Sequence, residues 1–124
     1  MSRAWPVPNE YGVYEHPEGQ RIGHSTRAAS LEIETAEVRP GEWRHALHLE
    51  LRSGIWLGVM YGMADDGPAA RDRREAIAQA VAAVRRALAG VPAPKGAAEK
   101  TVKMVESWCV CLLEPPDEQL DLFA

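Results

Sequence analysis

The sequence predicts an α+β fold: an antiparallel meander of four to five strands covered by one long helix, with a shorter second helix and a flexible C-terminal tail. Two segments in the first half alternate apolar and polar residues, as half-buried strands do. A long amphipathic helical pattern follows them. The strands precede the helices along the chain, as in an α+β fold. A chain of 124 residues is long enough for one such domain.

The first predicted strands are residues 11–16 and 20–25, which flank the turn sequence Pro17-Glu18-Gly19. Proline and glycine favour the backbone angles of tight turns, so we expect these two segments to form a hairpin. The third strand is "LEIETAEV", in which Leu31 and Ile33 share one face and the glutamates share the other.

The pair Pro40-Gly41 predicts a turn into the fourth strand, "WRHALHLELR". One face of this strand carries Trp43, His45, Leu47, Leu49 and Leu51. Ser53-Gly54 fits a two-residue hairpin loop into "IWLGVMYG". That loop would place Leu51 opposite Trp56, Leu49 opposite Gly58 and Leu47 opposite Met60.

The long helix is expected near residues 68–89, with Asp65 or Asp66 as its cap, Pro68 in its first turn and Gly90 at its end. Its apolar stripe, which would cover the sheet, is Ile77, Ala80, Val81, Val84, Ala87 and Leu88. Residues 97–107 predict the second helix, and "WCVCLL" a last buried segment. Residues 1–113 would then form a single domain. Residues 114–124 would form an acidic, proline-containing tail.

Charge is distributed unevenly along the chain, whose net charge is -4. Residues 68–113 carry eight Lys or Arg against four Asp or Glu, whereas residues 1–67 carry six against ten. The chain has no apolar run of transmembrane length and no signal-peptide pattern at its start, so we expect a cytoplasmic protein without a membrane partner. Its two cysteines, Cys109 and Cys111, are expected to be reduced thiols.

No cofactor or metal is expected from the sequence. The cysteines are too close for familiar zinc spacing, and His45 and His48 would point to opposite faces of one strand. Glu32, Glu34 and Glu50 share a predicted sheet face with His48 and Arg52, which suits an acid–base site but equally a solvated surface. No phosphate-binding loop or nucleophile motif is present, so no catalytic residue is assigned.

The helical segment also offers a basic surface. Its arginines lie away from the apolar stripe: Arg71, Arg73, Arg74, Arg85 and Arg86. Together with exposed aromatic side chains, Arg71, Arg74, Arg85 and Arg86 are candidates for contact with single-stranded nucleic acid. A solvated helix face of mixed charge has the same pattern, and the acidic first half opposes strong binding.

The chain ends in Gln119-Leu120-Asp121-Leu122-Phe123, after a Pro-Pro pair. This pentapeptide resembles the motif by which bacterial proteins bind the sliding clamp, the beta subunit of DNA polymerase III. The family pattern reads Gln-Leu, Ser or Asp, then Leu-Phe, and all five positions match. The resemblance covers five residues of 124 and carries no information about the globular body.

The resemblance implies a role for each residue of this pentapeptide. Leu122 and Phe123 would enter a hydrophobic pocket of the clamp, with Leu120 as a flanking contact. Gln119 would make amide hydrogen bonds, and Asp121 would lie at the rim.

The chain is thus expected to be a small accessory protein that docks on the clamp, in replication, repair or as a phage or mobile-element modulator. The alternatives are a small DNA-acting enzyme or single-stranded-DNA-binding domain targeted by the same tail, and a plain interaction domain whose tail packs back on the body.

Overall fold

The computed structural model describes residues 5–15, 17 and 19–114. The strands are β1 (Val13–Tyr14), β2 (Gln20–Ser25), β3 (Ala29–Arg39), β4 (Glu42–Leu51), β5 (Leu57–Tyr61) and β6 (Met63–Ala64). The helices are α1 (Arg73–Ala89) and α2 (Ala97–Leu113). These elements confirm the predicted α+β class. The predicted tail, residues 114–124, lies outside the described residues except for Glu114.

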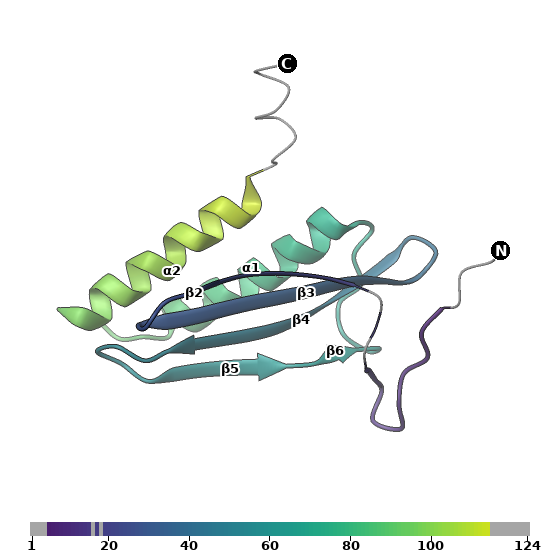
Figure 1. Cartoon of the computed structure of the whole chain (residues 1–124), viewed down its shortest axis with the longest axis horizontal. Coiled ribbons are helices and arrows are strands. Elements are labelled where there is room, and N and C mark those ends of the chain that lie inside the picture. The colour runs from purple at the N-terminus through teal and green to yellow at the C-terminus, as the bar shows by residue number, and fades with distance from the viewer. Residues whose placement is uncertain (1–4, 16, 18, 115–124) are drawn as a thin grey trace, which may run out of the picture.

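The main sheet is an antiparallel meander of four strands in the order β2-β3-β4-β5, and both helices lie on one face of it (Figure 1). Side chains from β3, β4 and both helices share the main core, which includes the fully buried Leu31, Ile33, Leu49, Val84 and Val105. The alternation in β3 and β4 produces this arrangement, because every second side chain is removed from water against the helices.

The predicted first hairpin is wrong. β1 pairs with β6 in a separate two-stranded sheet, with Val13 opposite Ala64 and Tyr14 opposite Met63, whereas β2 pairs with β3. Tyr14, Ala36, Val38 and Met63 form a second, smaller core between this sheet and the end of β3. The N-terminal segment therefore packs on residues from the middle of the chain.

The predicted register of the β4–β5 hairpin is wrong by one residue. Leu51 lies opposite Leu57, Leu49 opposite Val59 and Leu47 opposite Tyr61. The connection is longer than two residues, and Gly54 adopts a positive φ of 78° within it. Because side chains alternate between faces, the shift exposes Met60 and Trp56 and turns Tyr61 toward the helices.

The helix α1 begins later than the pattern predicted. Asp72 is its N-cap, accepting a hydrogen bond from the Glu75 backbone N–H at 2.8 Å, and neither Asp65 nor Asp66 takes that role. Gly90 ends the helix as predicted, and its N–H bonds to the Ala87 carbonyl. The helix α2 is longer than predicted: it includes the "WCVCLL" segment, so both helices span 17 residues.

Candidate functional site

A cavity forms where the chain leaves the edge of the sheet after β5. Pairing with β4 stops at Tyr61 opposite Leu47 and resumes only at Ala70, which exchanges two backbone hydrogen bonds of 2.8 and 2.9 Å with Trp43. Residues 44–46 of β4 therefore face the much longer segment 62–69. The excess length bends away from the sheet and leaves a space between this segment, β4 and α1.

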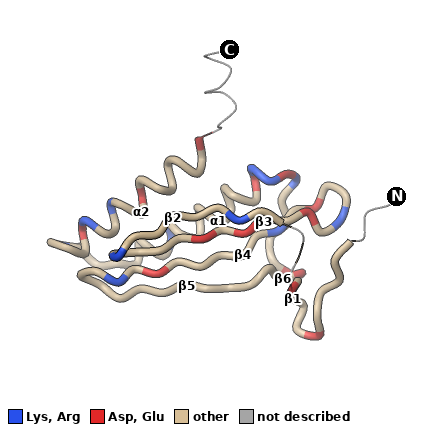
Figure 2. Tube along the Cα trace, viewed as in Figure 1, with Lys and Arg blue, Asp and Glu red and all other residues tan. Residues whose placement is uncertain are grey.

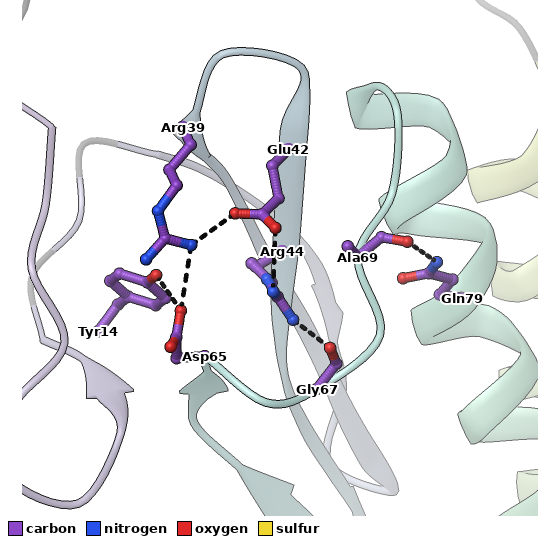
Figure 3. A network of polar contacts seen from close by, with 8 residues as sticks. All are labelled: Tyr14, Arg39, Glu42, Arg44, Asp65, Gly67, Ala69 and Gln79. Atoms are coloured by element: carbon purple, nitrogen blue, oxygen red, sulfur yellow. Dashed lines mark hydrogen bonds and ion pairs between the residues drawn. The ribbon is translucent and has the colours of Figure 1, made fainter.

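Polar contacts hold the 62–69 segment in place from two sides (Figure 3). On the sheet side, the Arg44 guanidinium donates to the Gly67 carbonyl and to Glu42 Oε1. On the helix side, the Gln79 amide donates to the Ala69 carbonyl at 3.0 Å. Arg44 is only 6 % exposed, so this segment is fixed by a buried charge-assisted contact.

A second anchor joins the segment to β1. The Tyr14 hydroxyl donates to Asp65 Oδ1, which also accepts from Arg39 Nη1 at 3.4 Å (Figure 3). The bond from Tyr14 is the main cause of the lowered pKa of Asp65, and Arg39 acts in the same direction. Burial and the bond to Asp65 raise the pKa of Tyr14. The hydroxyl therefore keeps its proton, and the carboxyl stays ionised.

The resulting cavity has a volume of about 470 Å³. Its walls are largely apolar, formed by the ring of Tyr61 and by small residues of α1 and the 62–69 segment, including Ala64, Pro68, Ala82 and Ala83. Its polar lining comes from Arg44, His45, Gln79, Arg86 and the Tyr61 hydroxyl. A small-molecule site typically combines apolar walls with a few polar groups in this way.

His45 and Tyr61 form a hydrogen-bonded pair in this lining. The His45 Nε2 and Tyr61 Oη atoms are 2.6 Å apart, and the two rings meet edge to face. His45 is 7 % exposed, and burial lowers its pKa. Burial likewise raises the pKa of Tyr61, while the nearby Arg86 acts in the opposite direction. Both groups are therefore uncharged at neutral pH.

Three buried polar atoms around the cavity have no hydrogen-bond partner among the described residues: Arg44 Nε, His45 Nδ1 and Gln79 Oε1. Gln79 is nevertheless close enough to His45 to raise the pKa of the imidazole, against the stronger effect of burial. An acceptor that faces an imidazole N–H acts in this direction. Arg44 Nε remains a buried donor with unused capacity.

The predicted arginines are distributed over different parts of the surface. Arg86 lines the cavity. Arg85, one residue earlier, lies toward α2, where its charge lowers the pKa of Cys109 against the effect of burial. Arg71 forms an exposed ion pair with Glu75 at 3.0 Å, and Arg74 borders the same shallow hollow between the start of α1 and the end of α2. The structure therefore brings only Arg86 to the cavity.

The acidic face of the sheet is the one that the helices leave open, and Figure 2 shows its acidic positions along β3 and β4. Its side chains neutralise one another: Glu34 pairs with Arg21 at 3.1 Å, and Glu50 pairs with Arg52 at 3.2 Å. His48 lies 3.7 Å from Glu50. These exposed ion pairs describe a solvated surface. Within residues 5–15, 17 and 19–114, no three His, Cys, Asp or Glu side chains gather closely enough to hold a metal ion.

The clamp-motif residues Gln119, Leu120, Asp121, Leu122 and Phe123 lie outside the described residues. Conversely, the cavity is lined by three residues that no sequence motif indicated: Arg44, Tyr61 and Gln79. The sequence feature that could have indicated the cavity is the glycine- and proline-containing stretch between strand and helix, "YGMADDGPAA", which is too long for a tight connection.

Comparisons with protein-family models, with curated proteins and with solved structures returned no match to this chain. Among the described residues, neither helix has the length and apolar character needed to cross a bilayer.

Proposed function

We propose that this protein is an accessory factor that docks on the bacterial DNA sliding clamp through Gln119–Phe123. The observation that carries the proposal is the five-position match of this peptide to the clamp-binding pattern. The peptide follows a proline-rich, acidic spacer, which suits presentation to a partner.

The end of α2 is compatible with this role. The helix finishes at Leu113, and Glu114 adopts an extended conformation with φ of -71° and ψ of 130°. This conformation is expected before Pro115, since proline disfavours the helical region for the residue that precedes it. Four residues separate Glu114 from Gln119, so an extended spacer could carry the peptide on the order of 15 Å beyond the helix.

The energetics of a short docking peptide fit the residue types present. Burial of Leu122 and Phe123 would contribute roughly 1.5–3 kcal/mol each, and Leu120 would add a smaller contact. Ordering of the peptide opposes this gain, so affinity on the order of micromolar is expected. The clamp is a ring with more than one binding site, and several bound copies or a second contact would strengthen attachment.

The first prediction concerns this docking. We expect the full-length chain to bind an immobilised, purified bacterial clamp, and the double variant Leu122→Ala/Phe123→Ala to lose at least about 10-fold in affinity, because both anchoring side chains are truncated. Asp121→Ser is the matched control, since the family pattern accepts either residue, and it should bind like the native chain. Equal binding by the double variant, or none by the native chain, would refute the proposal.

A stability measurement separates docking from packing against the body. Deletion of residues 119–123 should leave the melting temperature unchanged within a few degrees if these side chains serve a partner. If Leu120, Leu122 and Phe123 packed on the domain, their loss would cost several kcal/mol and lower the melting temperature by about 10 °C or more.

Nucleic-acid contact by the body is a second candidate function. Arg74, Arg85 and Arg86 are exposed, and none of them forms an ion pair within the described part of the chain. Unpaired guanidinium groups are available for phosphate contact. Their distribution over different sides of α1 favours weak binding without sequence preference.

A further inference from the structure

The cavity beside β4 has the features of a built binding site. Its lining includes two side chains that are more than nine-tenths buried, Arg44 and His45, and each keeps a polar atom without a partner in the described structure. Unsatisfied buried polar atoms are rare because each costs free energy. Both side chains line one cavity of about 470 Å³, which combines these buried polar groups with apolar walls as ligand sites do.

The charge of the lining selects the ligand. Arg44 and Arg86 both line the cavity, and its described lining contains no Asp or Glu. Arg44 is partly neutralised by Glu42, at 3.3 Å. Arg86 has no ion-pair partner among the residues that the structure describes, and its charge reaches the Tyr61 hydroxyl, whose pKa it lowers against burial. An anion is therefore favoured and a cation disfavoured.

The neutral His45–Tyr61 pair adds polar lining without adding charge. Gln79 raises the pKa of His45, as an acceptor facing an imidazole N–H does, so His45 carries its proton on Nδ1 and its Nε2 accepts from the Tyr61 hydroxyl. Tyr61 is 38 % exposed, so its ring can be reached from solvent. An anionic oxygen could thus accept from Arg86 beside this ring, while an apolar body contacts Ala64, Ala82 and Ala83.

From this geometry we propose that the cavity binds a small organic anion, with a carboxylate or phosphate head at Arg86 and an apolar body against the Tyr61 ring and the alanine-rich walls. The two head groups share the chemistry that the site recognises: anionic oxygens that accept from a guanidinium fork. The proposal is independent of the clamp peptide, because every residue that carries it lies within β4–α1.

The test uses the full-length protein and three ring-sized probes: benzoate, phenyl phosphate and the neutral benzamide. In a titration followed by two-dimensional ¹H–¹⁵N spectra, at least one of the two anions should bind saturably and shift the resonances of Gly62, Gln79 and Arg86. Benzamide should bind at least about 10-fold more weakly than that anion, because it lacks the charge. Saturable binding by neither anion, or equal binding by benzamide, would overturn the proposal.

Neighbouring arginines provide a matched pair of variants. Arg86→Ala should weaken binding at least about 10-fold, whereas Arg85→Ala removes the same charge from the α2 side of the helix and should change it less than about 2-fold. Both residues are exposed, so both variants should fold. Similar effects of Arg86→Ala and Arg85→Ala would show a diffuse charge effect and contradict the proposed site.

Discussion

At the scale of single residues, His45 illustrates how burial sets the state of a titratable group. Its imidazole is nearly enclosed between β4, Tyr61 and α1, and burial lowers its pKa from the ordinary 6.5. Gln79 on α1 opposes this shift, and the charge of Arg86 acts on the neighbouring Tyr61, whose pKa it lowers. In the unfolded chain the same histidine would titrate normally.

The free energy of unfolding should consequently depend on pH through His45. Because the folded pKa lies below the unfolded one, the unfolded chain binds more protons between the two values, and stability falls as the pH decreases below about 6.5. We expect His45→Gln to reduce the loss of stability between pH 7 and pH 5, measured by urea unfolding. His48→Gln, at an exposed histidine of the same strand, is the control for the change of side chain. An unchanged slope in His45→Gln would contradict this account.

Asp65 contributes to the free energy of unfolding in a different, more acidic pH range. Its folded pKa is lowered from 3.8, mainly by the hydrogen bond from Tyr14, so its stabilising effect is present above that value and is lost at more acidic pH. The two contributions are therefore separable, since the window between pH 5 and pH 7 lies above the titration of Asp65.

At the scale of elements, the loop between β4 and β5 contacts the first turns of α2 and fixes their position. Thr101 Oγ1 donates to the Ser53 carbonyl at 2.9 Å. Gly54 follows with a φ of 78°, and a Cβ atom added there would lie 2.3 Å from the Ala98 backbone nitrogen. The backbone of the loop thus approaches the helix more closely than any side chain would allow.

Gly54→Ala should therefore be strongly destabilising. Gly41→Ala is the matched control, because Gly41 has a similar φ of 73° but nothing within 4 Å of the place that a Cβ atom would take. Gly41→Ala should lower the free energy of unfolding by about 1–2 kcal/mol, because alanine is strained in the left-handed backbone conformation. Gly54→Ala should cost at least about 2 kcal/mol more, since backbone atoms must move apart. Equal unfolding free energies of the two variants in urea would show that the loop yields without cost.

The elements also show what local sequence pattern can and cannot predict. Alternation in β3 and β4 predicted both strands and their buried faces, because each packs one side against the helices. The β4–β5 register was missed by one residue, since Ser53-Gly54 resembles a two-residue loop and the close approach to α2 is not encoded locally. Because of this error the sequence did not indicate Tyr61 as a neighbour of His45. The expected register would have placed the Tyr61 side chain on the other face of the sheet.

At the scale of the whole molecule, the helix arginines allow a test of nucleic-acid contact. We expect weak binding of a labelled single-stranded oligonucleotide that falls steeply with added salt, with a slope of about -0.7 per phosphate contact. Arg85→Ala/Arg86→Ala should weaken binding at low salt, whereas Arg71→Ala, already paired with Glu75, should have little effect. Binding that is independent of salt, or unaffected in the double variant, would argue against phosphate contact by these residues.

The candidate cavity could not be predicted from sequence because its parts meet only in the folded molecule. The Tyr14–Asp65 contact joins residues 51 positions apart, and it replaced the local hairpin and the helix cap that the sequence suggested for those segments. Strand alternation alone would place Arg44 on the face opposite His45 and Leu47, in contact with water, but the 62–69 segment buries it. The clamp peptide, by contrast, is a linear motif that needs no tertiary contact to be recognised.

The attachment of the 62–69 segment outside the main core has a consequence for how the cavity exchanges its contents with water. One wall of the cavity is built from β4 and α1, which belong to the main core. The other wall, residues 62–69, is held by the second core and by hydrogen bonds from Tyr14, Arg44 and Gln79. A segment held separately from the main core can open locally without unfolding of the domain. We expect this local opening, rather than diffusion, to set the rate at which a molecule enters and leaves the cavity.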